Sequence, residues 1–434
     1  MNIINDSNCS WLNQLENRKK VIELKEDIKC DYLIVGAGYT GLSAARILGK
    51  VEKNKKIIII DAQLAGEGAS SRNSGYLVDT TLNDGFTSNR NHIDYLKKVK
   101  IYEKGISSVK NFISDYQVEC DWNESGKYFA SSIIEDEYQI NKFSELLNKL
   151  NFKHKIFYQK DLKKNIGTEF YKIGLYTYGG ILLNPAKLAR SMIKALPQNV
   201  LLFENSTLFK WKKYNNKIEC LVGKNKLITN KIIFCANGFL SSLGIKKRHC
   251  FPLTLTASMT RPLTDYEFDK IGRPNEWGVL PVRPMGATVR MTKDRRILIR
   301  NTVENKKPNF FSKKNLKKNS EIQRIGLCKR FPELPKNIIE NSWSGVVCRS
   351  GNGSQIFEKI NDHIFVAGCY NGSGIGVGTF FGEQIALMAA EQNSEEIPMI
   401  EKIKKTNWLP PQPLLNIGIY LRLFYERIKA SSDI

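Results

Sequence analysis

Three glycines and an aspartate form the first pattern in this chain that could do chemistry. Gly36, Gly38 and Gly41 follow a short apolar run, and Asp61 ends a second apolar run. In a unit of strand, turn, helix and strand, such glycines let the backbone approach a pyrophosphate, and the acid accepts hydrogen bonds from ribose hydroxyls. The helix N-terminus offers free N–H groups to the phosphates. The spacing therefore predicts a Rossmann-type dinucleotide site, because a glycine-rich turn in an ordinary α/β sheet leaves the distance to the acid unexplained.

Two further glycine-rich stretches indicate which dinucleotide is bound. Residues 66–75 form a loop of small residues soon after Asp61, and residues 368–378 lie between a buried-strand pattern and an apolar helix pattern. A helix N-terminus at the second stretch can face a group that gains negative charge. A reduced flavin gains such charge at its pyrimidine edge. The two stretches favour a flavin over a nicotinamide cofactor, and a flexible loop at 368–378 is the alternative.

The chain resembles the D-amino-acid-oxidase-like family of FAD-dependent oxidoreductases, and within it the branch that oxidises amines such as γ-glutamylputrescine. The first glycine motif is shared by many flavoproteins, whereas its combination with Arg72–Asn73 and the late glycine stretch is much more specific. The similarity extends through most of the chain. It includes Ser10–Trp11 and residues 30–45, 68–75, 183–188, 343–345, 370–376 and 408–411.

The resemblance implies the fold class, which is α/β with an α+β second domain. A Rossmann-like FAD-binding domain would carry an inserted substrate domain built on an antiparallel sheet. The length of 434 residues agrees with more than one core, and no linker separates two independent halves. We expect an N-terminal extension (1–30), a discontinuous FAD-binding domain (31–85, 165–245 and 340–395), a substrate domain (86–164 and 246–339) and a C-terminal tail with an amphipathic helix (396–434).

The resemblance also implies which residues hold FAD. The first glycine turn would surround the pyrophosphate, and Asp61 would hold the adenosine ribose, where the family more often has Glu. The 66–75 loop would lie beside the isoalloxazine ring, and the late glycine stretch under its pyrimidine end. The implied cofactor-binding residues are Gly36, Ala37, Gly38, Tyr39, Thr40, Gly41, Asp61, Ala62, Ser70, Arg72, Asn73, Leu208, Ala236, Gly372, Gly374 and Ile375.

Two residues are candidates for positioning the substrate. Arg290 stands where the family often has a Tyr-Arg pair, with Val289 in place of the tyrosine. It would bind a substrate carboxylate through two hydrogen bonds, or it is a surface arginine at a strand end. Tyr370 would wall the pocket, or it is a packed core tyrosine. Arg261 and Arg283 are weaker candidates, and no metal-ligand spacing is present.

Two stretches depart from the family pattern beside the expected catalytic cavity. Arg300–Asn301 replaces a usual Gly-Gly pair, and residues 348–355 replace a usual proline-containing loop. An unusual substrate and a lost activity both remain open.

The function implied is oxidation of the C–N bond of an amine or amino acid by hydride transfer to flavin N5, followed by hydrolysis of the imine. The reduced flavin would pass its electrons to oxygen or another acceptor. The main alternative is a flavin-binding protein without amine oxidase activity that acts in a complex or a modification pathway. An NAD-linked dehydrogenase is the third hypothesis.

Charge and cysteine usage indicate the surroundings of the protein. The net charge of +23 comes from lysines spread over the whole chain, so we expect no nucleic-acid partner, and the densest patch, 306–318, is interpreted as a solvated surface. Nine scattered cysteines without a C-x-x-C pair indicate a cytoplasmic location. Residues 414–430 form a basic amphipathic helix pattern. This helix would pack on its own domain or make a peripheral contact with the inner membrane.

Overall fold

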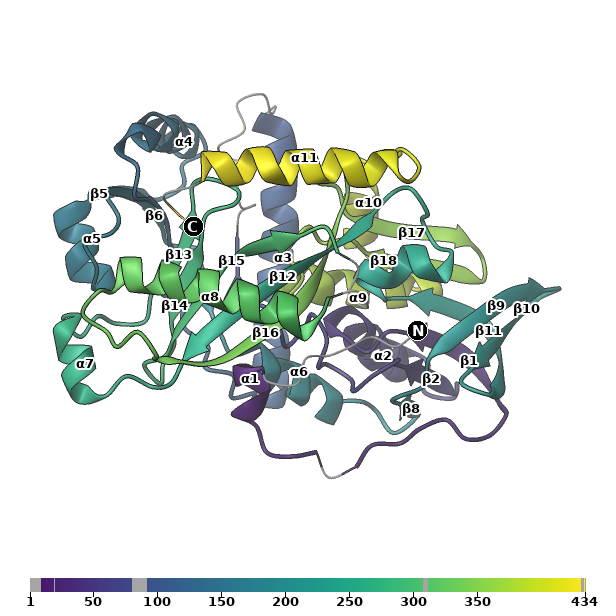
Figure 1. Ribbon diagram of the computed structural model, residues 1–434. Coiled ribbons are helices and arrows are strands. Elements are labelled where there is room, and N and C mark those ends of the chain that lie inside the picture. Colours follow the sequence, from purple (N-terminus) through teal and green to yellow (C-terminus); the bar gives the residue numbers. More distant parts are fainter. Residues whose placement is uncertain (1–8, 19, 80–91, 307–310, 431–432, 434) are drawn as a thin grey trace.

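The computed structural model describes residues 9–18, 20–79, 92–306, 311–430 and 433 (Figure 1). Two large sheets organise these residues. One has the order β17-β18-β11-β1-β2-β8, with β10 and β9 continuing from β11, and the other has the order β16-β12-β15-β14-β13-β4-β6-β5. The predicted α/β fold with a second, sheet-based domain is confirmed.

The core of the first sheet is parallel. β1 lies between β11 and β2, and Val35 at its end is level with Phe234 and Ile60 at the ends of those neighbours. The carboxyl ends of the three strands therefore form one edge, the place where open α/β sheets bind ligands. The parallel strands are β1 (Ile28–Val35), β2 (Ile57–Ile60), β8 (Val200–Phe203), β11 (Asn225–Phe234) and β18 (Ile364–Gly368), and the antiparallel ones are β9 (Leu208–Tyr214), β10 (Lys217–Val222) and β17 (Ile356–Asn361).

Both faces of this sheet are covered, which is why β2 consists of four isoleucines. Side chains alternate between the faces of a strand. Ile57 and Ile59 join a core cluster with three helices, whereas Ile58 and Ile60 join a second cluster on the side of β10. The three helices are α2 (Tyr39–Val51), α3 (His92–Tyr116) and α9 (Gly376–Ala389).

The second sheet is antiparallel except where β13 runs parallel to β4. Helix α8 (Lys313–Arg330) covers one face, where Leu327 packs in a cluster with Val289 and Ile299. The strands are β4 (Lys127–Ser131), β5 (His154–Tyr158), β6 (Ile173–Thr177), β12 (Phe251–Thr260), β13 (Gly278–Pro281), β14 (Thr288–Met291), β15 (Ile297–Glu304) and β16 (Ile339–Arg349).

The other elements lie outside the two large sheets. Helix α6 begins at Pro185, and the Asn184 side chain before it accepts hydrogen bonds from two backbone N–H groups, as an N-cap does. The remaining elements are α1 (Ser10–Asn13), β3 (Tyr76–Leu77), η1 (Ile134–Asp136), α4 (Glu137–Lys149), α5 (Gln159–Ile166), β7 (Ile181–Leu182), η2 (Asn237–Leu243), α7 (Asp265–Lys270), α10 (Glu396–Glu401) and α11 (Leu414–Lys429).

The strand pairing bears on the expected domain boundaries. β6 lies within the range 165–245, and all of β16 except Ile339 lies within 340–395. Both ranges were assigned to the FAD-binding domain, yet both strands pair within the second sheet. Those two strands therefore belong structurally with the substrate side, and the rest of the division stays a prediction. Residues 307–310 of the basic patch lie outside the described residues.

Candidate active site

A cavity of about 1080 Å³ lies between the carboxyl edge of the first sheet and the second sheet. Its lining includes Val35 and Ile60 at the ends of β1 and β2, and Leu253 and Arg300 from β12 and β15. This volume slightly exceeds the roughly 300–1000 Å³ found for small-ligand pockets. The cavity is therefore large for a single small ligand.

The first glycine turn closes one wall. Gly36 has a φ of +101°, in the region that favours glycine. A Cβ on Gly41 would lie 1.8 Å from the carbonyl oxygen of Gly36, so only glycine lets α2 begin directly behind the turn. Gly36, Gly38, Tyr39 and Thr40 line the cavity, whereas the structure places Ala37 and Gly41 behind that lining.

Asp61 lies beside this turn at the end of β2. Its Oδ2 accepts a hydrogen bond from the Ala37 N–H at 2.7 Å, and its Oδ1 accepts one from the Gln63 N–H at 2.9 Å. Burial raises the pKa of Asp61 to about 6, and the two backbone hydrogen bonds act in the opposite direction. Asp61 and Ala62 both line the cavity, so the carboxylate borders the space beside the glycine turn, and its contact with a ribose stays a prediction.

The 66–75 loop is held by groups from outside it. The indole Nε1 of Trp11 donates to the Asn73 carbonyl oxygen at 2.9 Å, and that of Trp343 donates to the Arg72 carbonyl oxygen at 3.1 Å. The Arg72 guanidinium donates in turn to the Ser344 carbonyl oxygen at 3.1 Å. Ser70, Arg72 and Asn73 line the cavity. The N-terminal extension and β16 thus fix a loop whose own residues are mostly small.

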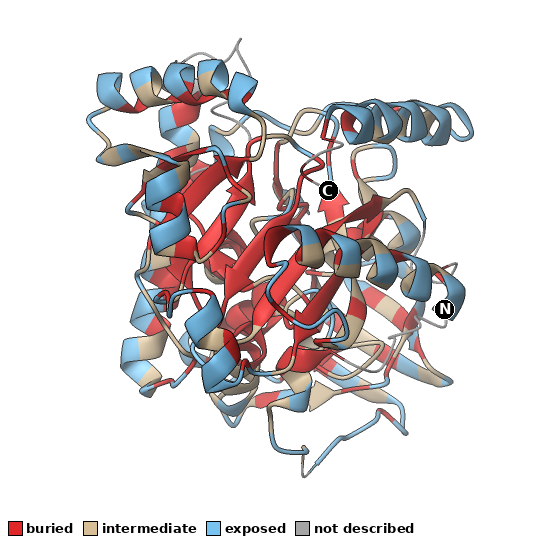
Figure 2. Cartoon of the chain, turned by 60° about the vertical axis from the view of Figure 1, so that its left-hand side comes forward, coloured by how far each residue is buried: buried red, intermediate tan, exposed pale blue. Residues whose placement is uncertain are grey.

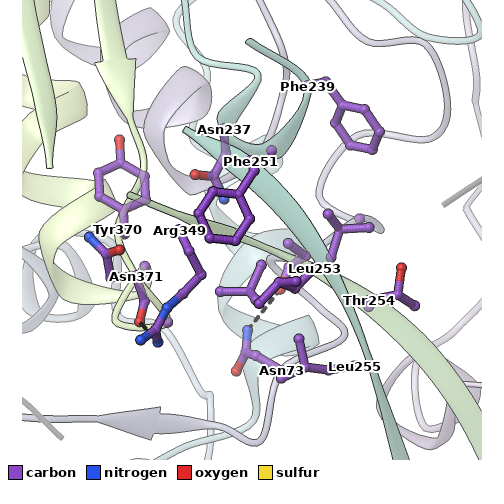
Figure 3. A pocket seen from close by; sticks show the side chains of 18 of the residues that line it. Asn73, Asn237, Phe239, Phe251, Leu253, Thr254, Leu255, Arg349, Tyr370 and Asn371 are labelled. Atoms are coloured by element: carbon purple, nitrogen blue, oxygen red, sulfur yellow. Dashed lines mark hydrogen bonds between the residues drawn. The ribbon is translucent and has the colours of Figure 1, made fainter. Parts of the chain in front are cut away.

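The late glycine stretch forms another part of the wall. Gly372, Gly374 and Ile375 line the cavity just before α9 begins at Gly376. Tyr370 also lines it (Figure 3). Its ring is only 4% exposed, and its hydroxyl lies 2.8 Å from the Thr40 hydroxyl. Tyr370 is therefore both packed in the core and part of the cavity wall. Its expected role in positioning the substrate stays a prediction. Leu208 and Ala236, also expected at the cofactor, line the cavity as well.

Arg290 has a different position from the one expected. It is 1% exposed and is not part of the cavity lining, so the alternative of a surface arginine is wrong. Its Nη1 donates to the carbonyl oxygens of Ser74, Gly75 and Leu183 at 3.2, 3.0 and 2.9 Å. Its guanidinium carbon lies 5.3 Å from the centre of the Trp11 ring. These contacts place Arg290 under the 66–75 loop, where its charge is used to hold backbone carbonyls.

The weaker candidates Arg261 and Arg283 also lie outside the lining. Arg261 forms an ion pair with Glu267 at 2.5 Å, and Arg283 forms one with Asp136 at 2.9 Å. Both guanidinium groups therefore already face a carboxylate within the chain.

Two arginines that the sequence analysis did not propose as substrate-positioning residues line the cavity. The Arg300 Nη2 donates to the Thr288 hydroxyl at 2.6 Å, and the Arg349 Nη1 donates to the Asn371 carbonyl oxygen at 3.1 Å (Figure 3). Burial lowers the pKa of Arg300 to about 10, and nearby Arg349 acts in the same direction. The usable signal was an arginine directly after the apolar run 297–299, which the sequence analysis interprets only as a departure from the family pattern.

The rest of this wall is largely apolar. It combines side chains of the second sheet with the inner side of α11, the long helix drawn across the top of Figure 1. Phe239 and Phe251 project towards the same space in Figure 3. The apolar lining residues on this side include Leu253, Leu255, Leu280, Met285, Val303, Leu415, Ile419 and Leu423.

Other reactive groups do not converge on the cavity. Within the described part of the chain, no histidine belongs to the lining and no group of three His, Cys, Asp or Glu side chains could hold a metal ion. Cys348 and Cys369, which lie near the late glycine stretch, are 0% exposed and also outside the lining, whereas Cys235 belongs to it. Burial raises the pKa of the Cys235 thiol.

These residues fit FAD on the geometry alone. A glycine cradle that a Cβ would fill lies at the N-terminus of α2, the Asp61 carboxylate lies beside it, and the late glycine stretch precedes a second helix N-terminus. A helix N-terminus suits phosphates and developing negative charge.

Comparison with known proteins gives the same result. Residues 31–388 match the family described as DAO, FAD dependent oxidoreductase. The chain is 25% identical over 398 residues to the probable oxidoreductase OrdL of Haemophilus influenzae, with 86% of each chain covered. It is 22% identical over 384 residues to the gamma-glutamylputrescine oxidoreductase of Escherichia coli, with 84% of each covered.

Solved structures share the fold at low identity. Glycine oxidase from Geobacillus kaustophilus superimposes with a TM-score of 0.73 at 15% identity, covering 88% of this chain and 100% of that one. Iminodiacetate oxidase from Chelativorans gives a TM-score of 0.68 at 15% identity, covering 84% and 96%. The family match extends over most of the chain and includes the glycine cradle, Asp61 and the late glycine stretch, and with it the resemblance noted in the sequence is confirmed: the chain belongs to the DAO family of FAD-dependent oxidoreductases, and FAD is its cofactor.

Proposed function

We propose that the protein oxidises the C–N bond of an amine or amino acid that carries an acidic group. The observation that carries the proposal is Arg300, a partly buried cation of the cavity wall whose guanidinium donates a hydrogen bond to the uncharged Thr288 hydroxyl. A buried cation is costly unless it is paired. A carboxylate on the substrate supplies the missing charge through a charge-assisted hydrogen bond.

The names of related proteins support this class of substrate. Glycine, iminodiacetate and γ-glutamylputrescine, which appear in the names of proteins similar to this chain, are all amines with a carboxylate. The identities are low, so these compounds indicate a chemistry and do not specify which amine this chain accepts.

The chain's own residues would bind and orient such an amine. Thr288 holds the Arg300 guanidinium from one side, so the group is positioned before the substrate arrives. The apolar side chains of the second sheet and of α11 exclude water and favour the neutral form of the amine. FAD supplies the hydride acceptor at its N5 atom, and the imine product is then hydrolysed.

The expected contact with a membrane also stays a proposal. Within the described residues, no helix is long and apolar enough to cross a bilayer. The structural basis for a peripheral contact is the outer surface of α11.

The test is anaerobic mixing of the purified FAD-loaded protein with pairs of amines that differ in one carboxylate. Suitable pairs are glycine with methylamine and γ-glutamylputrescine with putrescine, together with iminodiacetate and the L- and D-amino acids. Loss of visible flavin absorbance reports reduction, and a peroxide assay in air reports reoxidation by oxygen.

We expect reduction by at least one carboxylate-bearing amine and none by its neutral partner. Reduction without peroxide would identify a dehydrogenase. A yellow protein that none of these compounds reduces would contradict the proposal and favour a flavin-binding protein without amine oxidation.

A further inference from the structure

Helix α11 has a broad apolar surface that the rest of the chain leaves exposed. Each member lies three or four residues from at least one other member, so together they share one broad side of the helix. Each is between 49% and 66% exposed. We call this surface the outer face of α11, and it consists of Ile417, Tyr420, Leu421, Phe424, Tyr425 and Ile428.

The helix is already packed on its own domain by a different row of residues. Ile419 and Leu423 are partly buried against a cluster that includes Leu253 and Val303 of the second sheet. Figure 2 shows the consequence, because the helix that ends beside the C label is mostly pale blue on its outward side. Packing on the domain therefore explains why Ile419 and Leu423 are apolar. It does not explain why the outer face is apolar.

The charges around the outer face are almost all positive. Arg422, Arg427 and Lys429 are exposed on the helix, and its only acid, Glu426, is 8% exposed and forms an ion pair with Arg422 at 2.5 Å. The segment before the helix adds exposed cations and a tryptophan that is 56% exposed: Lys402, Lys404, Lys405 and Trp408.

We propose that α11 docks onto the surface of a bilayer that contains anionic lipids, with its outer face in the headgroup region. Three properties match such an interfacial helix: an apolar side, flanking Lys and Arg side chains, and aromatic residues at the edge. The net charge of +23 adds a long-range attraction to the same surface. A helix of 16 residues lying in the plane needs no spanning length.

A protein partner fits these observations less well. Interfaces between proteins are depleted in lysine at their core, and here cations surround the apolar face with no exposed acid on the helix to select among protein partners. A second copy of this chain would bring the same positive charges against each other.

The experiment is co-sedimentation of the FAD-loaded protein with phosphatidylcholine vesicles, with and without a quarter of phosphatidylglycerol. We expect binding to the anionic vesicles, and a loss on raising the salt concentration, because each basic residue near the surface is worth about fivefold in affinity. Flavin absorbance of the pellet identifies the folded protein. This readout needs no substrate, so it stands or fails independently of amine oxidation.

Two variants with a matched control locate the contact. Leu421→Glu with Phe424→Glu changes the outer face at residues outside the cavity lining, and Tyr138→Glu with Tyr266→Glu makes the same charge change at two exposed sites on α4 and α7. We expect the first pair to reduce vesicle binding at least about tenfold and the second to have a much smaller effect. Lys404→Gln with Lys405→Gln should weaken only the binding to anionic vesicles.

Three results would overturn the proposal. The first is equal binding to neutral and anionic vesicles, and the second is equal loss in the two glutamate pairs. The third is self-association without lipid that the α11 pair abolishes, measured by analytical ultracentrifugation, because it would assign the outer face to a second copy.

Discussion

The half of the cavity that we assign to FAD depends on backbone geometry, whereas the half that we assign to the substrate depends on side chains that come together from separate strands. In the first half, Gly36, Gly41 and Asp61 lie within one contiguous unit, and their contacts are with backbone atoms. In the second half, Arg300 and Thr288 come from two strands and face α11 from the end of the chain across the same cavity. A backbone site tolerates few changes, while a side-chain site can change its substrate one residue at a time.

The largest effect should come from adding one methyl group to the first half. In Gly41→Ala the new Cβ would meet the Gly36 carbonyl oxygen at 1.8 Å, so α2 must move away from the turn. We expect loss of nearly all bound FAD, measured as the ratio of flavin to protein and as uptake of added FAD. Gly68→Ala is the control, because no atom lies within 4 Å of its Cβ. A Gly41→Ala protein with full flavin content would show that the cradle does not depend on this approach.

In the second half, Arg300→Gln should weaken binding of carboxylate-bearing amines by about 100-fold, because removing one member of a buried charge pair typically costs 2–5 kcal/mol. FAD content should not change. The measurement is KM and kcat for whichever amine reduces the flavin, with the rise expected in KM. Arg300→Lys should recover part of the affinity, and exposed Arg248→Gln is the control. An unchanged KM would remove Arg300 from the substrate site.

A smaller effect is the pH dependence of FAD binding through Asp61. Burial raises the pKa of this carboxyl from 3.8 to about 6, so it is ionised above pH 6 and increasingly neutral below it. The ionised form is the stronger acceptor for ribose hydroxyls. The affinity of the apoprotein for FAD should therefore fall about tenfold from pH 7 to pH 5, measured by fluorescence titration. Asp61→Asn should bind more weakly with a flat profile over this range, and an equally steep profile in that variant would assign the titration to another group.

The smallest effect concerns the thiols between the two halves. A thiolate is the reactive form of cysteine. Among the described residues, Cys235 is the cysteine that lines the cavity, and burial raises its pKa. We therefore expect FAD to be bound without a covalent link. Acid precipitation should release all the flavin into the supernatant, and Cys235→Ser should leave the flavin content as it was. Flavin fluorescence that stays with the denatured chain would contradict this expectation.

The two halves also differ in how far the sequence predicts them. The glycine turn and Asp61 could be predicted because strand, turn, helix and second strand are contiguous, and their spacing alone places the acid beside the turn. The late glycine stretch was predictable for the same reason, since the strand before it and the helix after it are sequence neighbours.

Arg290 and Arg300 show why the substrate half was harder to predict. Thr288 pairs with Arg300 and Arg290 pairs with Leu298, so alternation puts both arginines on the same face of the second sheet. Trp11 and the 66–75 loop cover Arg290, while Arg300 remains in the cavity wall. Each arginine directly follows an apolar residue in its strand, so the strand pattern does not distinguish them. The difference is that distant segments cover Arg290, which makes it structural, and leave Arg300 able to contact a substrate.

The sequence by itself determined the nucleotide-binding unit, because strand, glycine turn, helix and acid are local neighbours whose spacing any folded form must respect. The fold class and the choice of FAD came from the family resemblance that the same sequence carries. The tertiary structure decided which arginine lines the cavity, which thiol borders it and which side of α11 stays exposed. Those outcomes depend on contacts between residues far apart in the chain, and a strand or helix pattern specifies two faces without specifying what will cover them.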